Sequence, residues 1–474
     1  MEFSSLTFLC IFLPAVFLLY TAIPNLRARN ILLIVASLAF YAYGEIVYVL
    51  LMIFSTILNY FCARWVARDP EHKNKAALIV AVAVNLGILG VFKYTGMLVS
   101  TFNDVTGLGV PVPEIALPIG ISFFTFQALS YVIDVYRGTV DVQKNYLNIL
   151  LYISFFPQLI AGPIVKYRDI NEQIADRHQD IDKIARGLRR FIGGLMKKVL
   201  IANTMGAVAD LFFTQELGEL SAPAAWLGAV AYLFQIYYDF SGYSDMAIGL
   251  GLMFGFDFKE NFNYPYGAVS IKDFWRRWHI SLSTWFKEYL YIPLGGNRKG
   301  RARAALNRLI VFFCTGLWHG ASWTFVVWGL WHGLFLLLEE YVPFTRRMPR
   351  ILGHLYSLLA VTLGFVIFRA DTIGYGFGYI GRMFAGGADA ASMSTVLGQL
   401  TPWFLTIAVA AIIGCAPIRP LADRIRLKLC GDGALTVPWR IAQICLYVLA
   451  FAGLFFCILQ LSPGGYNPFI YFRF

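Results

Sequence analysis

Apolar stretches follow one another along almost the whole of this 474-residue chain, and they restrict its possible folds more than any other feature. We expect the first membrane spans at about residues 6–23, 31–43, 46–63 and 76–100, close to the ~20 residues that a helix needs to cross a bilayer. Hydrophobic residues make up 58% of the chain and charged residues 14%, which excludes an ordinary soluble domain. The short alternating segments of a membrane barrel are missing, so the sequence predicts an all-α polytopic membrane protein.

The beginning of the chain resembles a membrane span more than a signal peptide. The first apolar stretch directly follows Met1 and Glu2 without a basic segment, and no small-residue cleavage site follows it. We therefore expect residues 6–23 to be a retained first span. The chain shows no internal repeat and no linker rich in proline or serine, so we expect a single domain over residues 1–474.

The net charge of +11 is spread unevenly. Basic residues gather in segments 64–75, 166–198, 272–308, 346–350 and 419–440, whereas segments 101–114, 214–223 and 386–399 contain no lysine or arginine. By the positive-inside rule the first group is cytoplasmic and the second faces outward. Attraction to anionic lipids explains such basic loops, and a phosphate-bearing thioester donor or an acidic carrier protein would suit them equally. Nucleic acid is not an expected partner, because these charges flank apolar stretches and form no separate domain.

The seven cysteines are scattered, mostly in apolar stretches, and none forms a CxxC pair. Cysteines in such surroundings are typically buried free thiols. We therefore expect neither a disulfide framework nor a metal site.

Helix breakers interrupt two apolar segments in the first half of the chain. They are Leu117-Pro118-Ile119-Gly120 and the segment PQLIAGP at 157–163. Broken backbone at membrane depth is tolerated only where it is buried in protein or lines a water-filled cavity. If residues 115–136 cross inward, residues 146–163 must enter the membrane and return on the same side. The sequence therefore predicts a re-entrant element at 146–163.

Two histidines lie inside the apolar, aromatic run 309–338, which is expected to be embedded in the membrane. His319 follows Trp318 in GLWHG, and His332 lies in a second Trp-His-Gly motif. An ionisable side chain at bilayer depth is costly and rare, so each histidine is a candidate functional group. Histidine suits proton transfer near neutral pH. Alternatively, both histidines only pack between helices and form hydrogen bonds to the neighbouring backbone. This structural role is favoured more strongly for His332 than for His319.

The segment YYDFSGYSD at 237–245 places hydroxyls and carboxylates in the middle of an apolar helix. Ser241, Tyr243 and Asp245 are candidates to orient a histidine ring or to contact substrate, although the sequence cannot place them beside one.

Residues 274–290 are rich in tryptophan, arginine and lysine and are predicted to form an amphipathic helix at the cytoplasmic interface. This segment contains the candidate site residues Trp275, Arg276, Arg277, Trp278 and His279. One interpretation is a membrane-surface anchor of cations and belt aromatics, and the other is the wall of a binding pocket. The turn at 293–298, with Asn297, ends the segment; its glycines match no phosphate-binding fingerprint.

The order of these motifs resembles the membrane-bound O-acyltransferase family, in particular its bacterial alginate O-acetylation branch. Branches that act on teichoic acid, peptidoglycan and cellulose are near relatives. The resemblance covers essentially the whole chain and rests on YYDFSGYSDMAIGLG, FWRRWHISLSTWFKEYLYIPLGGNR, GLWHGASWTFVVWGLWHG, LPIGISFFTFQALSYVIDVYRG and YNPFIYFRF. It implies a bundle of roughly 11 transmembrane helices, with re-entrant and interfacial helices around a central tunnel, in a multi-pass protein of the bacterial inner membrane.

The resemblance also implies which residues act. The family's signature histidine falls on His319 and its second polar position, in RRWH, on His279, so these two are the expected catalytic residues. His332 is 13 positions from His319 and would lie on another face of one uninterrupted helix, so we rank it as secondary or structural. The expected substrate-binding residues are Arg276, Arg277, Trp275, Trp278, Asp245, Tyr243, Ser241, Trp318 and Asn297.

The implied reaction is acyl transfer, most simply of acetyl, from a cytoplasmic thioester across the membrane. Acetyl-CoA or an acylated carrier protein would be the donor substrate, with no bound cofactor. The resemblance implies a polysaccharide or cell-wall polymer as final acceptor and a separate outer-face acetyltransferase as partner. Three alternatives stay open: D-alanyl transfer to teichoic acid by the same fold, a non-catalytic transporter of polymer or precursor, and a membrane scaffold.

Overall fold

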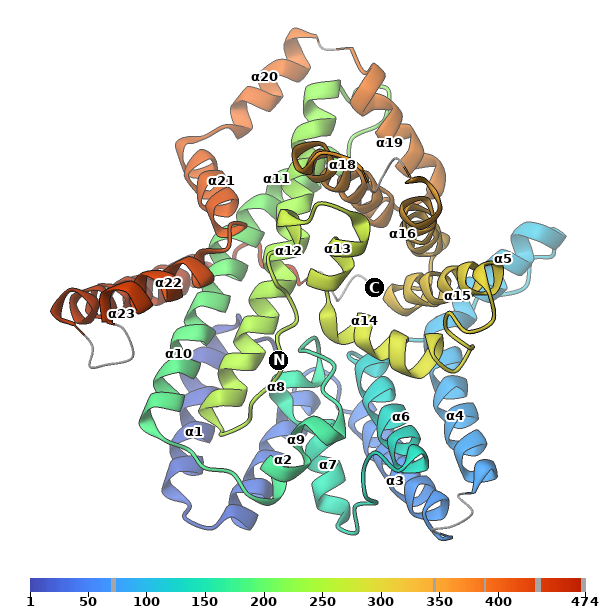
Figure 1. Ribbon diagram of the computed structural model, residues 1–474. Coiled ribbons are helices and arrows are strands. Elements are labelled where there is room, and N and C mark those ends of the chain that lie inside the picture. The colour runs from blue at the N-terminus through green and yellow to red at the C-terminus, as the bar shows by residue number, and fades with distance from the viewer. Residues whose placement is uncertain (70–73, 344–346, 388, 431–435, 470–474) are drawn as a thin grey trace.

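The computed structural model describes residues 1–474 except 70–73, 344–346, 388, 431–435 and 470–474. Within these described residues every regular element is a helix, as Figure 1 shows, so the predicted all-α class is confirmed. In the described ranges of the chain, five helical stretches are long and apolar enough to cross a membrane, or six if the bent pair α20 (Ala390–Gln399) and α21 (Pro402–Gly414) counts as one span. The roughly 11 spans of the family resemblance stay a prediction.

The N-terminal apolar stretches form helices close to the predicted positions. The first stretch combines the π-helical turn η1 (Phe8–Phe12) and α1 (Leu13–Ala22), and it is too short to count among the five spans. The helices are α1 (Leu13–Ala22), α2 (Leu26–Ala42), α3 (Tyr48–Val66), α4 (Lys75–Leu89) and α5 (Thr95–Thr106). The π-helical segment η2 (Gly90–Tyr94) joins α4 to α5, and together they form one 32-residue span.

Both predicted helix breaks are present, and they meet inside the protein. The chain enters α6 (Ile121–Arg137) at Gly120, which has a φ of +76°. Further on, α7 (Tyr146–Ser154) ends before the four-residue α8 (Phe156–Leu159). A Cβ atom at Gly120 would lie 2.9 Å from the carbonyl oxygen of Leu159, so only glycine permits this contact. The broken backbone at 157–163 is buried in protein, and the break at 117–120 packs against it and is partly exposed. That residues 146–163 re-enter the membrane remains a prediction.

A long buried helix, α12 (Ala222–Met253), runs through the centre of the molecule (Figure 1). It packs against α10 (Ile181–Met196) and α11 (Asn203–Phe213). Further helices before it and after it are α9 (Tyr167–Ala175), α18 (Arg350–Arg369), α19 (Ile373–Ala385), α20 (Ala390–Gln399), α21 (Pro402–Gly414), α22 (Ile418–Cys430) and α23 (Val437–Leu461). The segment 237–245 lies within α12, as predicted, and its hydroxyls and carboxylates are buried.

The predicted single amphipathic helix over 274–290 is wrong. The segment forms α13 (Ile271–Arg277), α14 (Ile280–Phe286) and the π-helical turn η5 (Lys287–Tyr291). The break lies at His279, a non-glycine residue with a φ of +44°. Asn261 holds the break: its carbonyl accepts the Ile280 N–H at 2.9 Å, and its side chain accepts the Ser281 hydroxyl at 2.8 Å. These contacts come from a distant loop, so periodicity in the segment itself does not reveal the break.

The run 309–338 also divides into two helices, α15 (Arg301–His319) and α16 (Trp323–Tyr341), joined by three residues. The backbone becomes extended at Gly320, and the Ser322 hydroxyl caps α16 by accepting the Thr324 N–H. His319 therefore ends one helix and His332 lies within the next. Because the helix is interrupted between them, the argument from the faces of one continuous helix does not apply to His319 and His332.

Close packing of α15 on α16 gives a test of the fold. A Cβ atom at Gly329 of α16 would overlap the carbonyl oxygen of Phe312 on α15, so Gly329→Ala must push the helices apart. Overpacking of this kind costs about 1–3 kcal/mol, and we expect a lower thermal midpoint for the detergent-solubilised protein.

Gly381→Ala on α19 is the matched control, because a Cβ atom there meets nothing within 4 Å. This variant should unfold at the wild-type temperature or slightly above it. Equal midpoints for the two alanine variants would contradict the tight α15–α16 contact.

Candidate active site

His319 is buried at the end of α15, with 6% of its surface exposed. Aromatic rings surround the imidazole: the ring centroids of Trp318 and Trp328 lie 5.0 Å away, and that of Phe368 lies 5.4 Å away. Neither ring nitrogen has a hydrogen-bond partner in the described part of the chain. Buried polar atoms are nearly always paired, so this imidazole is available to bind or move a proton on another molecule.

Two cavities meet α15 at successive levels. The larger has a volume of about 1240 Å³ and is lined along α15 by Arg308, Val311, Phe312 and Thr315. The smaller has a volume of about 200 Å³ and is lined by His319 together with Lys93, Leu117, Pro118, Ile119, Gly120, Ile121, Ser122, Phe123, Ile160 and Trp318. Thr315 and His319 are four residues apart and so share one face of the helix. One helical turn therefore separates the large cavity from the histidine.

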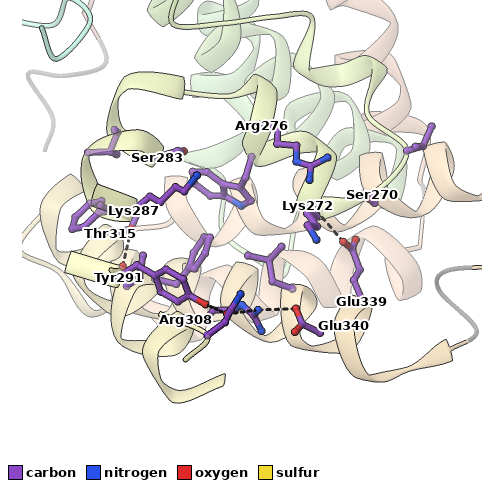
Figure 2. A pocket seen from close by; sticks show the side chains of 18 of the residues that line it. Ser270, Lys272, Arg276, Ser283, Lys287, Tyr291, Arg308, Thr315, Glu339 and Glu340 are labelled. Atoms are coloured by element: carbon purple, nitrogen blue, oxygen red, sulfur yellow. Dashed lines mark hydrogen bonds and ion pairs between the residues drawn. The ribbon is translucent and has the colours of Figure 1, made fainter. Parts of the chain in front are cut away.

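The large cavity is predominantly basic. Its lining includes Lys272, Arg276, Lys287, Arg308 and Arg350 against two glutamates. Figure 2 shows several of these side chains around the cavity, with Arg308 paired to one of the glutamates, Glu340, at 2.9 Å. Arg276 and Lys287 form no ion pair with a carboxylate among the residues that the structure describes. Uncompensated cations of this kind favour a phosphate-bearing ligand.

His279 is fully buried beside His319, with their ring centroids 6.3 Å apart. Its Nδ1 lies 3.3 Å from the Oδ1 of Asn261, and the Phe240 ring of α12 packs against it at 4.6 Å. The left-handed backbone at His279 is the kind of local strain that clusters at functional sites. The sequence did not indicate Asn261 as a site residue, because nothing in its own loop links it to His279, 18 positions later.

The other candidates of the 274–290 segment divide between the cavity and the core. Trp275 and Arg276 line the large cavity, and Figure 2 labels Arg276 at its edge. Arg277 instead pairs with Asp273 at 3.0 Å on its own helix. Trp278 is buried in an aromatic cluster, with its ring 5.2 Å from that of Phe365.

Two further candidates, Asn297 and Trp318, line different cavities. Asn297 lines the large cavity, where its Oδ1 accepts the Tyr291 hydroxyl. Trp318 lines the small cavity beside His319.

The sequence suggested that Asp245, Tyr243 or Ser241 orients a histidine ring. The described part of the chain shows no such contact between these side chains and the ring nitrogens of His319 or His332. Asp245 is engaged by Arg190 at 2.6 Å and by Lys197 at 2.7 Å. The Tyr243 ring stacks on Phe3 and Phe469 at 4.5 Å and 4.7 Å, and the buried Ser241 lines neither cavity. Phe240 faces His279, and Ser241 and Asp245, which are one and five positions later, point to other faces of α12.

His332 lines neither cavity. Its ring packs against Trp275 at 5.3 Å and against Trp328 at 5.2 Å. Trp328 also contacts His319, so an indole ring lies between the two histidines. We still predict a secondary or structural role for His332. The reason is now its separation from His319 by Trp328, and no longer the faces of a single helix.

Lys93 is a site residue that sequence reasoning missed. It is buried and lines the small cavity with His319. A signal was available, because Lys93 is a lone cation inside the apolar stretch 76–100, and intramembrane cations are functional candidates by default.

Comparisons with known proteins show which family this sequence resembles. The model of the membrane-bound O-acyltransferase family matches residues 140–370, which include all three buried histidines discussed above. A probable alginate O-acetylase of Pseudomonas putida is 40% identical, with complete coverage of both chains. A peptidoglycan O-acetyltransferase of Helicobacter pylori is 39% identical over 78% of this chain and 77% of its own. A teichoic acid D-alanyltransferase of Bacillus subtilis is 28% identical over 53% of this chain and 68% of its own.

These matches do not favour the transporter and scaffold hypotheses, because the related proteins are named as acyl-transferring enzymes. The full-length similarity, the family match and the motifs around the buried histidines lead to one assignment: this chain belongs to the membrane-bound O-acyltransferase family and is an O-acyltransferase.

Proposed function

We propose that this protein transfers an acetyl group from a thioester on the cytoplasmic side of a bacterial inner membrane to a hydroxyl acceptor delivered from the outer side. The observation that carries the proposal is the position of His319. This imidazole lines the small cavity, and one helical turn separates it from the basic cavity. A general base in that position can meet a donor and an acceptor that arrive from different directions.

The basic cavity is the proposed donor site. Its cations fit the phosphates of acetyl-CoA or the phosphopantetheine of an acylated carrier protein, and both donors are substrates and not resident cofactors. Arg276, Lys287 and Asn297 are in position to contact such a donor. Trp275, whose ring lies 5.3 Å from that of His332, supplies an apolar part of the cavity wall.

The proposed chemistry uses a neutral His319. The imidazole takes the proton of the acceptor hydroxyl as its oxygen attacks the thioester carbonyl, and a new C–O bond forms. When the C–S bond breaks, the imidazolium returns the proton to the leaving thiolate. His279 and Asn261 support this step by holding the wall beside His319 in place. No covalent enzyme intermediate is required.

The proposed final acceptor belongs to polysaccharide or cell-wall chemistry. The most similar relatives reported above are named as acting on alginate and peptidoglycan, and both are acetyl transferases. The D-alanyl relative matches at lower identity over a smaller part of the chain, so acetyl is favoured as the acyl group. A separate outer-face acetyltransferase is the proposed partner that places the group on the polymer.

The test is acyl transfer by the purified protein reconstituted in vesicles. Acetyl-CoA or an acetylated carrier protein is offered on one side, and a hydroxyl acceptor such as a soluble sugar oligomer on the other. We expect thiol release that depends on the acceptor, with the donor accepted from one face only. A protein that releases no thiol with either donor would contradict the proposed function.

Sidedness gives a second prediction. Residue 299 is exposed on the basic segment before α15, and we expect it to face the cytoplasm. A cysteine introduced as Lys299→Cys should react with an impermeant maleimide in inverted vesicles but not in intact cells. Residue 109, in the exposed segment without lysine or arginine, is the control, and Gly109→Cys should show the opposite pattern. Labelling of position 299 in intact cells would reverse the proposed direction of transfer.

A further inference from the structure

Lys93 places a buried cation at the small cavity, beside the proposed base. It lies on the π-helical turn η2 in the middle of the span Lys75–Thr106, and only 8% of its surface is exposed. Its Nζ donates to the carbonyl oxygen of Trp318 at 2.5 Å and to the Ser122 hydroxyl at 3.4 Å. No carboxylate pairs with it in the described ranges of the chain. π-helical turns inside α-helices are frequent at functional sites.

We propose that Lys93 is a catalytic residue whose ammonium stabilises the oxyanion formed when the acceptor attacks the thioester. The inference rests on the proposed function and adds a group to it. Lys93 and His319 line the same cavity of about 200 Å³, and Lys93 is bonded to the residue next to His319. A carbonyl placed for attack beside the imidazole therefore lies within reach of a cation that no carboxylate of the described chain neutralises.

The acceptor oxygen forms a bond to the thioester carbon, its proton passes to His319, and the carbonyl π electrons move to the carbonyl oxygen. The negative charge on that oxygen is held by an N–H of Lys93 until the C=O bond re-forms. The C–S bond then breaks, and the thiolate takes the proton from His319. In a water-poor cavity a fixed positive charge stabilises such an oxyanion strongly, because little solvent screens it.

A purely structural role would also explain the contact with Trp318. A lysine at the end of a helix can cap its last carbonyl groups, and Lys93 does so at the end of α15. Tyr94 caps the preceding carbonyl of the same helix, with its hydroxyl 2.7 Å from the oxygen of Leu317. Tyr94 does not line the small cavity, so it separates the capping role from the catalytic one.

The experiment compares Lys93→Gln, Lys93→Met and Tyr94→Phe in the reconstituted transfer assay. Glutamine keeps a hydrogen-bond donor for the Trp318 carbonyl but has no charge, whereas methionine loses both. We expect about a hundredfold lower kcat in both Lys93 variants, with the donor KM within twofold of wild type. Tyr94→Phe should keep kcat within threefold, and the thermal midpoint of each variant shows whether it is folded.

The outcomes separate this inference from the proposed function. A kcat of Lys93→Gln within threefold of an active wild type would overturn the role of Lys93 while leaving His319 as the base. A loss in Tyr94→Phe as large as that in Lys93→Gln would also overturn it, because capping would then explain both. If Lys93→Met fails to fold, Lys93→Gln alone decides. An inactive wild type would remove the proposed function together with this step.

Discussion

His319→Ala is expected to abolish acyl transfer while the protein still inserts and purifies normally. General acid–base catalysis is typically worth ~10²–10⁴-fold, so the loss should be close to complete in a cell-based assay of polymer acetylation. Three aromatic rings surround the imidazole at 5.0–5.4 Å and remain after the substitution, so the packing of α15 on α16 should persist. The measurement is kcat of the purified variant, with the thermal midpoint as the check on folding.

His332→Ala is the matched control for that variant. His332 is equally buried, lies in the same hairpin and also has ring nitrogens without a hydrogen-bond partner in the described residues. It lines neither cavity, and Trp328 separates it from His319. We expect His332→Ala to retain much of the wild-type kcat. Wild-type transfer by His319→Ala, or equal and total loss in the two variants, would contradict the assignment of His319 as the base.

Lys198→Met is expected to destabilise the protein more than any other substitution considered above. The Lys198 Nζ pairs with an oxygen of Asp239 at 2.9 Å, and only 3% and 1% of these side chains are exposed. Lys198 also donates to the carbonyl oxygen of Pro468 near the C-terminus. Removing one partner of a buried pair leaves an uncompensated charge and typically costs roughly 3–5 kcal/mol. We expect a large fall in the thermal midpoint and a low yield of folded protein.

The double variant Lys198→Met with Asp239→Asn tests this explanation. If the cost comes from the loss of the ion pair with Asp239, neutralising Asp239 should recover most of the lost stability, because a neutral replacement of a whole buried pair is often tolerated. A double variant that is no more stable than Lys198→Met would show that Lys198 acts through its other contacts, including Pro468.

Local patterns in the sequence predicted much of this molecule. Helix breakers at residues 117–120 and 157–163 indicated broken backbone, because proline and glycine alter the local conformation whatever surrounds them. His319 emerged as a candidate because an ionisable group in an apolar run is costly. The charged and aromatic character of 274–290 indicated a special segment, but it did not reveal that the helix breaks at His279.

The sequence by itself determined the helical class, the buried histidines and the family, because these depend on apolar length, residue type and the order of motifs along the chain. Tertiary structure alone decided which side chains meet. Lys93 reaches the Trp318 carbonyl across 225 positions, and Asn261 holds His279 from another loop. Asp245, an early candidate partner for the histidines, is bound instead by Arg190 and Lys197. Such contacts arise when distant helices pack, and no short-range periodicity encodes which faces those helices present to each other.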